Sequence, residues 1–143
     1  MDFLNILHIS TTGLTVQRAR MNVISTNLAN MYTTRTTTGG PYRRQIVVLE
    51  PRLVEDFESI LSSETESLCG VTVAAIVEDP TPFRRMYSPG HPDADKDGYV
   101  YMPNIDVITE MTDMMLARRS YEANVTAIGS TKAMLLKALE IGR

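Results

Sequence analysis

The strongest constraint on the fold is a long apolar stripe at each end of the chain. Near the N-terminal end, apolar residues recur seven positions apart, at Leu7, Leu14, Met21 and Leu28. A seven-residue apolar repeat is typical of a helix that packs along a partner helix in a coiled coil. The repeat therefore predicts a long helix within residues 1–31.

A second stripe runs through residues 104–143. Its apolar positions lie three, four or seven residues apart, at Val107, Met111, Met114, Tyr121, Val125, Ile128, Leu135 and Leu139. The basic residues Arg118 and Lys132 interrupt it. Asn104 follows Pro103 and has a side chain suited to capping a helix, so we expect the second helix to start there.

Both predicted helices are too long and too narrowly striped for a small domain. The simplest arrangement pairs them as an antiparallel coiled coil, in which each buried apolar side chain contributes about 1.5–3 kcal/mol. Such a pair leaves several apolar residues uncovered, namely Ile24, Ile108, Met115, Leu116 and Leu136. We expect further copies of the chain to cover them, which indicates an assembly subunit.

The middle of the chain, residues 32–103, has a different character. Its first part is rich in Thr and ends in Gly39-Gly40-Pro41, which predicts an extended loop. Short β-prone runs follow at residues 45–50, 70–77 and 99–101, and residues 55–67 form an acidic, Ser-rich stretch that we interpret as a variable insertion. The predicted fold is therefore mainly α, with a small β-rich middle region between two paired terminal helices.

An acidic turn carries the only pattern of metal ligands. Asp93, Asp95 and Asp97 precede Gly98 and match the start of a calcium loop. The twelfth position of such a loop should be a bidentate Glu, but here it is Asn104. An acidic turn whose carboxylates accept backbone N–H groups is the favoured interpretation, and no metal site is expected.

Catalytic patterns are missing from the sequence. His8 and His91 are the only histidines, neither stands in a known catalytic motif, and Gly39-Gly40-Pro41 lacks the Lys-Ser/Thr of a phosphate loop. We expect neither an enzyme nor a cofactor. The pairs Arg43–Arg44 and Arg84–Arg85 are interpreted as solvated or interface charges.

The charge and hydropathy patterns exclude two further classes of partner. Acidic residues dominate the middle of the chain, so the sequence lacks the concentrated basic face that nucleic acid requires. No run approaches the roughly 18 apolar residues that would span a bilayer, and no cleavable signal peptide precedes the first helix.

Several motifs together resemble the rod and hook proteins of the bacterial flagellum, and among them the proximal-rod subunits. They lie at the end of the first helix, in the 87–107 block and on the second helix. The residues that carry the resemblance are Asn27, Ala29, Asn30, Tyr42, Pro89, Gly90, Pro92, Tyr99, Pro103, Asn104, Glu122, Ala123 and Asn124.

This resemblance implies a structural subunit of the rod that spans the periplasm. Its partners would be further copies of itself, the proximal and distal rod proteins, the rod-base adaptor and the flagellar type III export apparatus, which exports subunits without cleaving a signal. A cytosolic helical adaptor or export chaperone is the alternative, because long amphipathic helices alone do not separate the two. The β-prone middle with its Gly-His-Pro turn favours the rod subunit.

Overall fold

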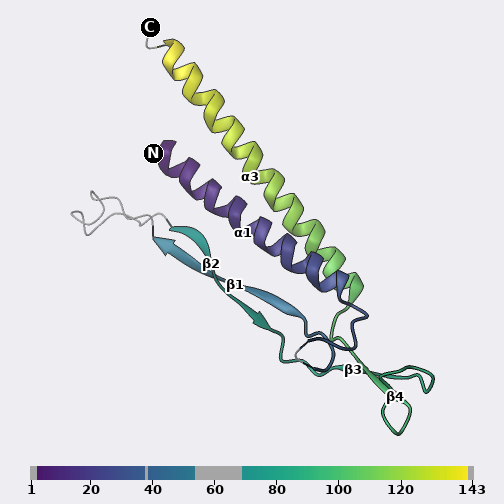
Figure 1. Cartoon of the computed structure of the whole chain (residues 1–143). Coiled ribbons are helices and arrows are strands. Elements are labelled where there is room, and N and C mark those ends of the chain that lie inside the picture. Colours follow the sequence, from purple (N-terminus) through teal and green to yellow (C-terminus); the bar gives the residue numbers. More distant parts are fainter. Residues whose placement is uncertain (1–2, 38, 54–68, 142–143) are drawn as a thin grey trace.

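The computed structural model describes residues 3–37, 39–53 and 69–141. Within these residues, two long helices precede and follow four strands along the sequence (Figure 1). The elements are α1 (Phe3–Ala29), β1 (Gln45–Leu53), β2 (Cys69–Glu78), β3 (Arg84–Tyr87), β4 (Tyr99–Met102) and α3 (Val107–Ile141). The prediction of a mainly α chain with a small β part is confirmed. Residues 55–67, the predicted insertion, lie outside the described residues.

The two helices lie side by side and run in opposite directions (Figure 1). Asn27 contacts Glu110, and 14 residues further along each helix Gly13 faces Asn124. In this register Phe3 lies opposite about residue 134, since 24 residues separate it from Asn27 and 134 follows Glu110 by the same number. The last turns of α3 therefore extend past the described part of α1.

The side of α3 that faces α1 carries two rows of residues with seven-residue spacing. One row is polar or small and the other largely apolar; together they comprise Glu110, Met114, Ala117, Tyr121, Asn124, Ile128, Thr131 and Leu135. All of them are buried or half-buried. Alternating steps of four and three residues keep these positions on one side of a helix.

Three residues of the predicted seam, Met111, Val125 and Leu139, lie outside those rows and are 58%, 47% and 71% exposed. Met111 precedes Met114 by three residues, which places its row about 60° further around the helix. Leu139 also lies beyond the start of α1. The predicted single seam is thus two stripes on different sides of α3, and the coiled-coil geometry of the helix pair stays a prediction.

Helix α1 packs between α3 and the β1–β2 hairpin (Figure 1). Its buried apolar residues are Val16, Val23 and Ile24, whereas Leu7, Leu14, Met21 and Leu28 are half-buried. Ile24 was expected to stay uncovered, but it is only 7% exposed because it lines a cavity with Ile46 and Val47 of β1. The hairpin covers a side of α1 that a two-helix arrangement would leave open.

The strands form two antiparallel pairs, β1 with β2 and β3 with β4. The β1–β2 register contains a bulge between Val48 and Leu49. Near Gly70, β2 passes so close to α1 that an added Cβ would lie 3.0 Å from the Thr12 hydroxyl oxygen. That hydroxyl accepts a hydrogen bond from the Val71 N–H at 3.2 Å, which fastens the hairpin to the helix.

Helix α3 begins at Val107, not at residue 104 as expected. Asp106 caps it: the Asp106 carboxylate accepts hydrogen bonds from the Thr109 hydroxyl at 2.6 Å and the Thr109 N–H at 3.3 Å. These bonds lower the pKa of Asp106, so the charged form that caps the helix is favoured. The Asn104 side chain does not cap the helix; it forms hydrogen bonds with Arg44 and Thr81.

A polar junction and an exposed helix stripe

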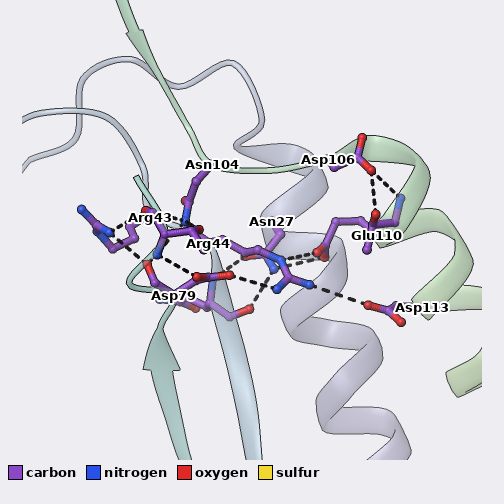
Figure 2. Close-up of polar contacts among 11 residues, drawn as sticks. Asn27, Arg43, Arg44, Asp79, Asn104, Asp106, Glu110 and Asp113 are labelled. Carbon is purple, nitrogen blue, oxygen red and sulfur yellow. Dashed lines mark hydrogen bonds and ion pairs between the residues drawn. The ribbon is translucent and has the colours of Figure 1, made fainter. Parts of the chain in front are cut away.

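Arg44, at the start of the hairpin, meets three carboxylates (Figure 2). Its Nε donates to Glu110 Oε1 at 2.6 Å, and its Nη1 donates to Asp79 Oδ2 at 3.2 Å. Its Nη2 lies 3.7 Å from Asp113 Oδ2. One guanidinium therefore links the end of β2 to the first turns of α3.

Glu110 is fully buried, at 0% exposure. A buried carboxylate is costly unless charge and hydrogen bonds compensate it, and Glu110 has both. Its second oxygen accepts from Asn27 Nδ2 at 3.1 Å. Burial lowers the pKa of Arg44, but the hydrogen bonds to Glu110 and Asp79 outweigh that effect and raise it, so the guanidinium stays charged.

Asn27 uses its complete hydrogen-bonding capacity while only 1% exposed. Besides Glu110, its Nδ2 donates to the Gln45 carbonyl at 2.9 Å. Its Oδ1 accepts from the Gln45 N–H at 3.0 Å and from the Tyr42 hydroxyl at 3.2 Å. Burial and then the charges of Glu110 and Glu78 raise the pKa of Tyr42, which keeps the phenol a donor.

Asn104 completes the polar cluster on the other side of Arg44. Its Oδ1 accepts from the Arg44 N–H at 2.9 Å, and its Nδ2 donates to the Thr81 hydroxyl at 2.7 Å. Asp79 accepts from the Thr81 N–H at 2.9 Å. Hydrogen bonds from the Thr81 N–H and hydroxyl, and then from Arg44, lower the pKa of Asp79.

We call this cluster the polar junction; it consists of Asn27, Tyr42, Arg44, Asp79, Asn104, Glu110 and Asp113 (Figure 2). It joins the end of α1, the start of β1, the end of β2 and the start of α3. Its side chains satisfy one another, so it holds elements in place and offers no group poised for chemistry.

Sequence reasoning misread part of this cluster. Arg44 was interpreted as a solvated or interface charge, but it is enclosed by ion pairs. Arg43 is also engaged: its guanidinium lies 4.2 Å from the Phe83 ring centroid and donates to the Asp79 carbonyl at 2.9 Å. Arg84 and Arg85 are exposed, as expected for surface charges.

The residues behind the family resemblance fall into three places. Asn27, Tyr42 and Asn104 belong to the polar junction. Pro89, Gly90, Pro92, Tyr99 and Pro103 lie along the β3–β4 connection and the exit from β4. The others lie on or beside the helices: Ala29, Glu122 and Ala123 are exposed, Asn30 donates to the Thr26 carbonyl at 2.9 Å, and Asn124 faces Gly13.

The acidic turn forms one hydrogen bond to a distant residue and one within the turn. Asp93 accepts from the Thr34 hydroxyl at 2.8 Å, and Asp95 accepts from the Lys96 N–H at 2.7 Å. Across residues 3–37, 39–53 and 69–141, no three His, Cys, Asp or Glu side chains converge as a metal site would require. Of the three carboxylates Asp93, Asp95 and Asp97, that of Asp95 accepts a backbone N–H as the acidic-turn interpretation expects.

The second stripe of α3 is apolar and open to solvent. We call it the outer stripe; it consists of Ile108, Met111, Met115, Val125 and Leu136, all exposed. An ion pair between Arg118 and Glu122, 2.9 Å apart, interrupts it. Large apolar side chains exposed along one side of a helix in this way indicate an interaction site. Within the described residues, no helix is both long and apolar enough to cross a membrane.

Two family models match the chain, one at each end. Residues 7–35 match the model described as flagella basal body rod protein. Residues 96–141 match the model described as the C-terminal part of flagellar basal body rod FlgEFG proteins. The matched ranges hold most of α1 and α3 together with Asn27, Asn104 and Glu110 of the polar junction.

Curated relatives match the chain over nearly its whole length. The flagellar basal-body rod protein FlgC of Bacillus subtilis is 48% identical over 96% of both chains. FlgC of Borreliella burgdorferi is 42% identical over 99% of this chain and 98% of its own. FlgC of Salmonella typhimurium is 38% identical over the full length of both. With identity this high over the whole chain, the protein belongs to the FlgC family of flagellar basal-body rod proteins.

Proposed function

We propose that the chain is a structural subunit of the flagellar basal-body rod, built to be covered by neighbouring rod subunits. The observation that carries this proposal is the outer stripe of α3, which presents five exposed apolar side chains beside the seam with α1. Helix α1 already has two neighbours in the chain, whereas this side of α3 has none among the described elements.

The nature of the contact follows from the shape of that surface. A narrow apolar stripe along one side of a helix fits another helix, which would bury apolar area worth roughly 25 cal/mol per Å². Further copies of the chain and the other rod subunits, from the rod-base adaptor to the distal rod proteins, would supply such helices. Repeated contacts between unlike surfaces build an open helix, as a rod requires, and not a closed ring.

The polar junction gives this subunit its rigidity. It locks the hairpin to both helices at one end through buried, charge-assisted hydrogen bonds. A subunit of a rotating shaft must carry load between neighbours without internal rearrangement. We assign that task to the junction, and we assign no catalytic step to the chain.

The route to the rod is also part of the proposal. We infer that the chain is carried by the flagellar type III export apparatus without removal of a signal peptide, and that it resides in the part of the rod that crosses the periplasm. The support is the family resemblance of the Asn27–Asn30 and Tyr121–Asn124 segments, since proteins of this family are named as basal-body rod proteins.

The proposal is tested by two substitutions on α3 in a strain that lacks the native gene. Val125→Asp places a charge in the outer stripe, and Ser130→Asp places the same charge at an exposed polar position. We expect Val125→Asp to remove the chain from purified basal bodies and to abolish swimming while its helical circular dichroism is retained. Ser130→Asp should leave all three unchanged.

Two outcomes would contradict the proposal. One is a wild-type chain that is detected only in the cytosol and never in purified basal bodies. The other is a fully motile strain that carries Val125→Asp as its sole copy.

A further inference from the structure

Among the residues that the structure describes, the C-terminal end of α3 has no partner. In the register of the helix pair, α3 passes the described start of α1 at about residue 134. The residues beyond, which we call the overhang (136–141), include Leu136, Leu139 and Ile141 at 53%, 71% and 85% exposure. One short helix end thus presents three large apolar side chains to solvent, at a free-energy cost that a partner would remove.

At the opposite end of the molecule lies a cavity of about 310 Å³. It is bounded by the turn after α1, by the β3–β4 hairpin and by the first residue of α3. Met31, Tyr32, Met86 and Met102 line it, and Tyr32 and Met86 are themselves exposed. Met and Tyr adapt well to an apolar partner and are enriched at binding surfaces.

The charge at this cavity suits the end of a helix. Arg84 lines it and forms no salt bridge with the described residues. The guanidinium of Arg85, by contrast, lies over the rings of Tyr99 and Tyr101 on the other face of the hairpin. The last four carbonyls of a helix lack intrahelical partners, and the helix end carries about half a negative charge. An apolar helix that enters with its C-terminal end first therefore meets both the apolar lining and the guanidinium of Arg84.

We propose that this cavity receives the overhang of a second copy of the chain. This proposal rests on the proposed function, because it names one of the contacts by which rod subunits meet. The end of α3 that forms the overhang and the β3–β4 hairpin that bounds the cavity lie at opposite ends of the helix pair (Figure 1), so the overhang of a chain cannot reach its own cavity. The contact joins two unlike surfaces head to tail and leaves one of each free, which extends an assembly along the helix axis.

Disulfide trapping between two co-expressed chains tests the contact. Both chains carry Cys69→Ser; one also carries Leu139→Cys and the other Met86→Cys. Oxidised basal bodies should contain a reducible dimer at about twice the 16.0 kDa of the chain. The control replaces Met86→Cys with Tyr101→Cys, which is exposed on the other face of the hairpin and outside the cavity, and should yield at least about tenfold less dimer.

A second measurement covers the case in which the cysteine variants do not assemble. Tyr32 is replaced by the photo-crosslinking residue benzoylphenylalanine, which preserves an exposed aromatic ring. After irradiation of whole cells, peptide mapping should place the crosslink within residues 136–141 of another copy.

The results separate this contact from the function itself. Basal bodies that contain both chains but no dimer, or a crosslink to a different rod protein, would overturn the contact and leave the proposed function intact. Absence of the wild-type chain from basal bodies would overturn the proposed function first.

Discussion

Glu110 takes its partners from two distant parts of the sequence, 66 residues away at Arg44 and 83 residues away at Asn27. No local pattern announces such contacts. In the sequence, Glu110 reads as an acidic residue favoured in the first turn of a helix, and Arg44 as half of a basic pair. Only the antiparallel pairing of the helices brings them together, so their mutual burial could not be predicted from spacing.

We predict that Glu110→Gln lowers the free energy of unfolding by about 2–3 kcal/mol. The substitution keeps the shape of the side chain but leaves the guanidinium of Arg44 beside a neutral amide, and removal of one member of a buried ion pair typically costs about 3–5 kcal/mol. The loss falls below that range because Asp79 and Asp113 remain near Arg44. Urea unfolding followed by circular dichroism measures it.

The matched control is Glu122→Gln, which breaks an ion pair of similar length with Arg118 at the surface of α3. Exposed helical ion pairs contribute about 0.3–0.5 kcal/mol, so this variant should unfold almost as the wild type does. Equal effects of the two substitutions would show that the buried ion pair of Glu110 contributes no more to the free energy of unfolding than the exposed pair of Glu122 does.

At the scale of the helix, periodicity predicted the elements well but not their faces. Met114, Tyr121, Ile128 and Leu135 recur every seven residues, and Met111, Val125 and Leu139 fall in a second row with the same spacing, in which Arg118 and Lys132 take the positions between them. Both rows satisfy the same pattern, and only the first faces α1. The buried positions Ala117 and Thr131, which decide the matter, carry no apolar signal strong enough to be read in advance.

The start of α3 shows the same limit. Asn104 and Asp106 are both good capping residues, and local sequence does not choose between them. The choice depends on Arg44, which is 60 residues away in the sequence and whose backbone N–H donates a hydrogen bond to the Asn104 side chain. Asp106 is thereby left to cap the helix.

Helices α1 and α3 approach each other closely at Gly13, and this contact leads to a prediction about stability. An added Cβ at Gly13 would lie 2.7 Å from Asn124 Nδ2. Alanine gains about 1 kcal/mol over glycine in a helix, but overpacking costs about 1–3 kcal/mol. Gly13→Ala should therefore destabilise the chain by about 1 kcal/mol, whereas the same change in an Asn124→Ala background should stabilise it.

Thermal and urea unfolding of the two single variants and the double variant form a complete cycle. A coupling of at least about 1 kcal/mol is expected. Simple additivity would mean that Gly13 and Asn124 do not set the distance between the helices.

For the whole molecule, the predicted fold class was correct because the apolar periodicity of a long helix can be recognised within its own stretch of sequence. The short strand β3 was missed, since Arg84-Arg85-Met86-Tyr87 is exposed throughout and lacks the alternation of a half-buried strand. The offset between the two helices along their axes could likewise not be predicted from the sequence. Apolar repeats determine which helix faces meet, but they do not determine the register of one helix along the other. That offset creates the overhang and separates the part of α3 that stabilises the chain from the part left for neighbours.

This separation leads to a prediction for a chain shortened to end at Leu135. The described part of the deleted segment, residues 136–141, runs past the described start of α1 and makes no contact with the polar junction, so we expect the free energy of unfolding to change by less than about 1 kcal/mol. Incorporation into basal bodies should fall at least about tenfold, because the apolar end that a neighbour would cover is missing. Chemical unfolding and quantification in purified basal bodies give the two values, and the exported fraction shows whether secretion is intact.

The control is Lys137→Gln, which removes a charge and the exposed ion pair with Glu140 but keeps Leu136, Leu139 and Ile141. It should be incorporated as the wild type is, because its apolar surface is unchanged. Normal incorporation of the shortened chain would mean that the overhang is dispensable and that subunits meet through the outer stripe upstream of it. A large loss of stability would instead place the overhang in the fold of the chain itself, against the register defined by the Asn27–Glu110 and Gly13–Asn124 contacts.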